Sequence, residues 1–404
     1  MSGFGVRAYR MTGNPHEVPK ISLAFAQRFG ISATRSAILA RYWFVMVKSG
    51  VQSKAAENSF NAVRLLAALQ VAYIHAIAHL KLAPTWGYEW IVQFPGVPIF
   101  FAVSGYLVFD SLLRLRSLKR FAAHRAARIY PALAVNILII EVLLYAAGQI
   151  EFTRSLSAVW ALLFFICYAA TASYNIASLW VGSGGGTLSF DGFFQIYPSG
   201  VLWTLTVELT FYAAIPIAAL MKSRASQTIL IAAASAASFA FQKFLGPDSR
   251  LTVTITIAPY FWIFGIGMLF RLWSVPTRLI RSAILPLLAA FMLFASLRHF
   301  ATFEWKSAPS GYDAFQTALL CALVLCIGVS PILKSKTLAR NDTSYGIYLY
   351  HMLIVTALMN IPEADRSQWL ILVVSIGAIL AGLCSWHLIE RPMMMFARGA
   401  SESR

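Results

Sequence analysis

Two ionisable side chains share one apolar segment early in the chain. Arg64 and His75 are eleven positions apart, so at about 100° per residue they differ by only about 20° around a helix and are roughly 16 Å apart along its axis. An ionisable residue inside a bilayer is costly and generally faces a cavity or a partner. Arg64 alone could be an interfacial anchor and His75 a hydrogen-bonded structural residue. Their common face favours a shared functional site.

Further candidates come from other apolar segments. Glu208 is a lone carboxylate that must pair with a cation, accept hydrogen bonds or stay protonated. Pairing with His75 would explain both residues, and a structural pair with an arginine is the competing interpretation. His351 and Tyr348 could line a cavity, and Ser104 lies in a segment of small residues suited to close packing or ligand approach. No metal site is expected, because His79 follows His75 by one turn but no acidic or cysteine ligand accompanies them.

The most basic stretch of the apolar region is 114–128. It holds six cationic residues and no acidic one: Arg114, Arg116, Lys119, Arg120, Arg125 and Arg128. Charge that fixes membrane orientation would account for a few of these. Such a dense cluster also suits a polyphosphorylated donor, since arginine can bind phosphate through two hydrogen bonds.

Hydrophobic helices must position these groups. The chain has 404 residues, of which 59% are hydrophobic and 12% charged, whereas soluble domains carry about a quarter charged residues. We predict an all-α, polytopic membrane bundle of about ten transmembrane helices plus one re-entrant or interfacial segment at 156–173. The predicted spans are 61–80, 89–112, 131–148, 200–221, 226–243, 251–271, 283–299, 313–333, 343–360 and 369–390.

The basic residues predict the orientation of this bundle. With the N-terminus inside and 156–173 not crossing, 25 of the 33 Lys and Arg residues lie in cytoplasmic segments and seven in outer loops or their edges. We therefore predict a multi-pass protein of the cell (inner or plasma) membrane with both termini in the cytoplasm. Its parts would be a basic extension at 1–59, a membrane domain at 60–395 and a tail at 396–404. Since the net charge of +17 is spread between spans, nucleic acid is not an expected partner.

Five segments, in order, resemble motifs of the acyltransferase-3 family of integral membrane acyltransferases. They are Arg64 with His75, FFAVSGY at 100–106, FAAHRAARIYP at 121–131, LWTLTVE at 202–208 and SYGIYLYH at 344–351. Thr204 replaces the family's usual Ser, and Tyr350 its usual Trp. Neither change removes a candidate catalytic group.

The resemblance implies an O-acyltransferase that uses cytoplasmic acyl-CoA, commonly acetyl-CoA, as donor and binds no permanent cofactor. The acceptor would be a carbohydrate or a lipid-linked glycan, as in O-acetylation of surface polysaccharides. Arg64, Arg125 and Arg128 would bind the donor, and His75 would be the general base. Glu208 would orient His75, and Ser104 is a weaker candidate for binding the oxyanion. Direct transfer and an acyl-histidine intermediate are both compatible with this arrangement.

Two other functions remain open at this stage. One is acylation of a small hydrophobic natural product, since no sequence pattern identifies the acceptor. The other is a non-enzymatic transporter of a glycolipid or metabolite, for which the inverted halves with matched broken helices are not evident.

Overall fold

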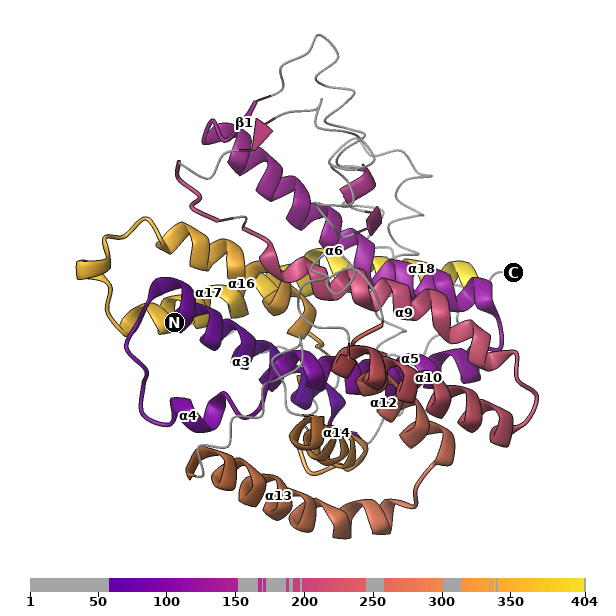
Figure 1. Ribbon diagram of the computed structural model, residues 1–404. Coiled ribbons are helices and arrows are strands. Elements are labelled where there is room, and N and C mark those ends of the chain that lie inside the picture. The colour runs from indigo at the N-terminus through magenta and orange to yellow at the C-terminus, as the bar shows by residue number, and fades with distance from the viewer. Residues whose placement is uncertain are drawn as a thin grey trace, which may run out of the picture. The chain divides into compact units, whose positions relative to one another are not determined.

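The computed structural model describes residues 58–151, 166–168, 170–171, 187–188, 192–196, 198–244, 258–300, 314–333, 335, 337–338 and 341–402. Segment 156–173 and the extension 1–59, both assigned from the sequence, lie largely outside these residues. Nearly all of the described structure is helical (Figure 1). The only strands among the described residues form a two-residue antiparallel pair, β1 (Ile150–Glu151) with β2 (Thr187–Leu188).

The helices follow the order of the predicted spans. They are α3 (Phe60–Leu80), α4 (Tyr88–Ile91), α5 (Gly96–Leu115), α6 (Leu118–Ala146), η2 (Gly200–Leu202), α9 (Trp203–Ala219), α10 (Arg224–Phe244), α12 (Phe261–Trp273), α13 (Thr277–Phe300), α14 (Ala314–Val329), α16 (Ser344–Leu358), η3 (Glu363–Asp365), α17 (Trp369–Ser385), η4 (Trp386–Glu390) and α18 (Arg391–Glu402). The all-helical prediction is confirmed. Six helical stretches are long and apolar enough to cross a bilayer and three more are shorter, so the count of about ten is not confirmed.

The basic stretch 114–128, which lies between the predicted spans 89–112 and 131–148, is mostly helix. Only Arg116 and Ser117 separate α5 from α6, and Arg116 ends α5 in the left-handed conformation with φ 49°. The Ser117 hydroxyl then accepts a hydrogen bond from the Arg120 backbone N–H, capping α6. Arg125 and Arg128 are therefore held on a regular helix, where neighbours three apart lie on adjoining faces.

The C-terminal end of the last span also differs from the prediction. The predicted span ends at residue 390. Instead, α17 passes through the π-helical turn η4 directly into α18, and Glu390 pairs with Arg128 of α6 at 2.6 Å. A π-helical turn inside an α-helix is rare and frequently marks a functional position.

Glycines set the close helix contacts around the site. A side chain at Gly105 of α5 would lie 2.1 Å from the Phe264 carbonyl oxygen of α12, and one at Gly267 would lie 2.1 Å from that of Ala102. The two backbones can pack this tightly only because both positions lack a Cβ. The small residues of 100–106 therefore serve helix packing.

Large apolar side chains cover the outer helices. Leu285 and Leu293 of α13 are 74% and 63% exposed, and Leu372 and Leu380 of α17 are 62% and 57% exposed. Apolar surface of this extent on soluble proteins marks an interaction surface, and here it belongs to helices of membrane-spanning length. These faces are suited to contact lipid.

Candidate functional site

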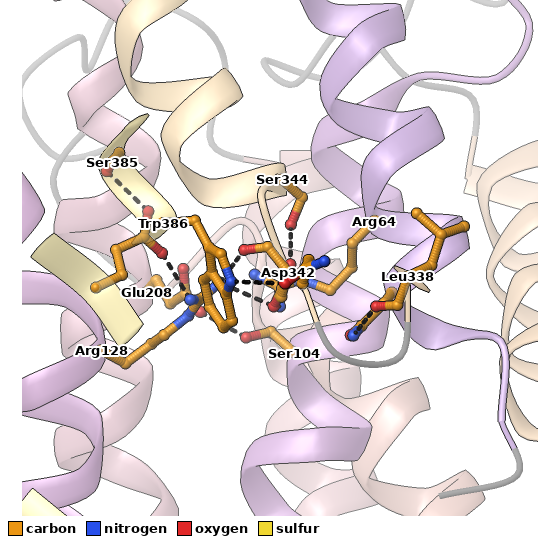
Figure 2. Close-up of polar contacts among 12 residues, drawn as sticks. Arg64, Ser104, Arg128, Glu208, Leu338, Asp342, Ser344, Ser385 and Trp386 are labelled. Atoms are coloured by element: carbon orange, nitrogen blue, oxygen red, sulfur yellow. Dashed lines mark hydrogen bonds and ion pairs between the residues drawn. The ribbon is translucent and has the colours of Figure 1, made fainter. Parts of the chain in front are cut away.

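An ionic cluster joins four segments that are far apart in the sequence. Asp342, just before α16, pairs with Arg64 of α3 and, at 2.8 Å, with Arg128 of α6. Arg128 also pairs with Glu390 of η4 at 2.6 Å. Figure 2 shows Asp342 between the two arginines. The N-terminal end of α3, the first turns of α6, the start of α16 and the end of α17 therefore meet here.

The cluster is satisfied by further hydrogen bonds. The Ser344 hydroxyl donates to Asp342 Oδ1 at 2.6 Å, and the Ser385 hydroxyl donates to Glu390 Oε1 at 2.8 Å. Burial by itself would raise the pKa of Asp342, but the Arg128 and Arg64 guanidinium groups and the hydrogen bonds from Ser344 outweigh it and lower that pKa to about 2. Asp342 is therefore a carboxylate at any physiological pH.

Described residues surround most of the Arg128 side chain. Its side chain is 12% exposed, and its guanidinium carbon lies 5.6 Å and 5.4 Å from the ring centres of Tyr345 and Trp386. Because it contacts two carboxylates and two aromatic rings, Arg128 links α6, α16 and η4.

Arg125 differs sharply from its neighbour. Its one described hydrogen bond is a long one, 3.5 Å from Nη2 to the Ser111 hydroxyl. Its Nε is buried without a hydrogen-bond partner among the described residues. Burying a guanidinium donor unpaired costs free energy, and Arg125, unlike Arg64 and Arg128, has no carboxylate partner among the described residues.

Glu208 and His75 are not partners in the described structure, contrary to the pairing expected from the sequence. Glu208 Oε1 accepts hydrogen bonds from the Ser104 hydroxyl of α5, at 2.6 Å, and from the Tyr212 hydroxyl one turn along α9. Because a hydroxyl has one proton, Ser104 cannot donate to an oxyanion while it makes this bond. Tyr212 was not among the predicted site residues, although it stands one turn after Glu208.

His75 is bonded to His351 instead. Nδ1 of His75 lies 2.8 Å from Nε2 of His351, and Nδ1 of His351 lies 2.8 Å from the Tyr348 carbonyl oxygen. His351 is fully buried, whereas His75 is half-buried. The Tyr348 hydroxyl, in turn, is 2.8 Å from that of Thr204. The structure thus joins three predicted residues, His75, His351 and Tyr348, in one cluster.

The site therefore has two parts. The ionic cluster contains Arg64 and Arg128, and the histidine pair lies further along α3 and α16. Asp342 was missed because it lies in a short polar connection rather than in an apolar segment, and only its position two residues before the 344–351 motif could have drawn attention to it.

Comparison with known proteins identifies the family. The sequence pattern of an acyltransferase domain family matches residues 57–388. Nodulation protein 10 of Rhizobium leguminosarum bv. viciae is 35% identical over 369 residues, covering 86% of this chain and 96% of that protein. An O-acetyl transferase of Shigella phage Sf6 is 25% identical over 348 residues, covering 83% of this chain and 95% of that protein. No solved structure matches. The chain belongs to the acyltransferase-3 family and is a membrane acyltransferase rather than a transporter.

Proposed function

We propose that this acyltransferase moves an acyl group, in the simplest case acetyl, from acyl-CoA to a hydroxyl of a carbohydrate on a lipid-linked or cell-surface glycan. The observation that carries the proposal is the half-buried imidazole of His75, held through one nitrogen by His351. A hydroxyl needs a base to become nucleophilic at neutral pH, and histidine is the side chain suited to that pH. The name of the phage relative, O-acetyl transferase, supports an oxygen acceptor.

The donor would bind at the end of the bundle that holds the arginines. Arg125 is the first candidate ligand for a phosphate, because its Nε has no partner among the described residues. Arg64 and Arg128 already share the carboxylate of Asp342, which offsets part of their positive charge. Arg64 and His75 lie on one face of α3, roughly 16 Å apart along its axis, and the pantetheine arm would have to span that distance to bring the thioester to the imidazole.

The acceptor hydroxyl, the donor thioester and His75 are sufficient for the transfer step. His75 Nε2 takes the proton of the acceptor hydroxyl as its oxygen attacks the thioester carbon. The tetrahedral intermediate then collapses, the carbon–sulfur bond breaks, and the proton passes from the imidazolium to the leaving thiolate. The products are the O-acyl ester and free coenzyme A thiol. Glu208, which accepts hydrogen bonds from Ser104 and Tyr212, would hold α5 against α9.

Purified protein with labelled acetyl-CoA tests the proposal. Transfer to a glycan acceptor, or donor hydrolysis without one, should fall about 10²–10⁴-fold in His75→Ala, because a general base supplies acceleration of that size. The folded fraction, measured by gel filtration in detergent, should be unchanged. Near-normal turnover per folded His75→Ala molecule would end the assignment. Transfer to a hydrophobic small-molecule alcohol, with none to glycans, would show that the acceptor is a small hydrophobic natural product and not a carbohydrate.

A further inference from the structure

The hydrogen bonds of the histidine pair fix where its protons lie. A backbone carbonyl oxygen can only accept a hydrogen bond, so Nδ1 of His351, 2.8 Å from the Tyr348 oxygen, must carry a proton. A neutral His351 then has a lone pair on Nε2, and the proton in the 2.8 Å contact with His75 must be on His75 Nδ1. A neutral His75 is left with its lone pair on Nε2.

The ring geometry supports a strong bond of this kind. The two imidazole centres are 5.1 Å apart and the ring planes differ by 15°. With the two nitrogens only 2.8 Å apart, a centre separation this large means that the rings meet edge to edge and nearly coplanar. The lone pair of His351 Nε2 therefore lies in line with the His75 N–H, which is the preferred geometry for donation.

We propose that His351 is a positioning residue that holds His75 in the tautomer protonated on Nδ1, so that its Nε2 can accept a proton from the substrate. His351 itself is fully buried and both of its nitrogens are used, so it acts through His75. In hydrolytic triads a carboxylate plays this part, and here the pair contains no acid. It is neutral at rest and carries one positive charge after His75 takes the proton.

This inference rests on the proposed role of His75 as base. Two isosteric substitutions of His351 test its positioning role separately from the role of His75. In His351→Gln, the side-chain oxygen reaches the place of Nε2 and can still accept from His75. In His351→Asn, the shorter amide can still donate to the Tyr348 carbonyl but cannot reach His75. Both replacements are polar and buried at the same position, so they are matched controls for stability.

The expected result is a difference in kcat at a constant donor KM. His351→Asn should lose about 10²–10⁴-fold in kcat, since loss of the orienting partner in a triad has a cost of that order, whereas His351→Gln should stay within about tenfold of the unsubstituted protein. In the His75→Ala background, His351→Asn should cause no further loss. Equal losses in both variants that follow their melting temperatures would overturn the proposal.

Nitrogen-15 NMR of histidine-labelled protein in detergent gives a second readout that does not need turnover. His75, assigned by its absence in His75→Ala, should show a protonated Nδ1 and an unprotonated Nε2, and His351→Asn should mix the tautomers. An unchanged tautomer in His351→Asn would overturn the positioning role. Full turnover in His75→Ala would remove the proposed function instead.

Discussion

The carboxylate of Asp342 is shared by two of the three arginines that the sequence selects for donor binding. Arg64 and Arg128 both bond to it, and Arg128 also bonds to the buried Glu390. Arg125 has no carboxylate partner among the described residues. The two arginines of the 121–131 motif therefore differ: Arg128 pairs with carboxylates from two other segments, and Arg125 pairs with none among the described residues.

Substitution of these two arginines should separate binding from stability. Arg125→Ala should raise the donor KM by an amount equivalent to about 1.5–3 kcal/mol, the contribution of a charge-assisted hydrogen bond, with little change in melting temperature. Arg128→Ala leaves the Asp342 and Glu390 carboxylates without this cation and should cost about 3–5 kcal/mol of stability. Donor kinetics and thermal unfolding in detergent measure the two effects. An unchanged donor KM in Arg125→Ala would show that this arginine binds no phosphate.

The low pKa of Asp342 predicts how the ionic cluster depends on pH. A carboxyl whose pKa is about 2 when folded and near its ordinary 3.8 when unfolded stabilises the fold above pH 3.8, and that stability is lost as pH falls toward 2. Asp342→Asn should therefore lower the melting temperature by a constant amount between pH 5 and 7, and by less below pH 4. Asp365→Asn, at an exposed position of η3, serves as the control. A difference that persists unchanged at low pH would contradict the ion-pair explanation.

At the scale of helices, the sequence predicts which segments are helical better than it predicts where each helix ends or which side chains its residues contact. The predicted spans correspond to observed helices because long apolar runs satisfy backbone hydrogen bonds internally in lipid. Helix ends were less predictable: α6 begins at Leu118, well before the predicted span 131–148, and α17 continues through η4 into α18. Hydropathy cannot register such ends, since polar helical turns can extend beyond the bilayer.

The partners of buried ionisable residues could not be read from the sequence. Glu208 bonds to Ser104 and Tyr212, and His75 bonds to His351. Each choice depends on the rotation and depth of one helix against another, and residue spacing within a single helix fixes neither. The shared face of Arg64 and His75, a property of one helix, was accessible from spacing alone.

The α5–α12 contact gives an element-scale prediction. In Gly105→Ala, the added methyl would meet the Phe264 carbonyl oxygen at 2.1 Å, so the backbones must separate. Overpacking of this kind costs about 1–3 kcal/mol, which should appear as a lower melting temperature in detergent. Gly399→Ala in α18 is the matched control, because nothing lies within 4 Å of its added methyl and alanine favours helix. Equal melting temperatures in the two variants would contradict tight packing at Gly105.

At the scale of the whole bundle, contacts at both ends of α3 agree with the relative helix directions that the predicted topology requires. The beginning of α3 meets the beginning of α16 and the end of α17 through Arg64, Asp342 and Arg128 with Glu390. The opposite end of α3 is tied to the connection after α16, where Lys81 pairs with Glu363. These ties agree with the predicted course of the chain, in which α3 and α16 run in the same direction and α17 returns. The positive charge is concentrated at the Arg64 end, which we therefore expect to be cytoplasmic.

Cysteine labelling in intact cells tests this orientation. The native cysteines, Cys167, Cys321, Cys326 and Cys384, are first replaced, and single cysteines are introduced at Glu363 and Arg120, both of which are exposed. A membrane-impermeant maleimide should label Glu363→Cys in intact cells and Arg120→Cys only after lysis, because the predicted topology assigns 25 of the 33 basic residues to the Arg120 side. The reverse pattern would invert the bundle. It would also place the arginines on the side of the membrane away from cytoplasmic acyl-CoA. The same experiment therefore decides whether the ionic cluster can receive the donor at all.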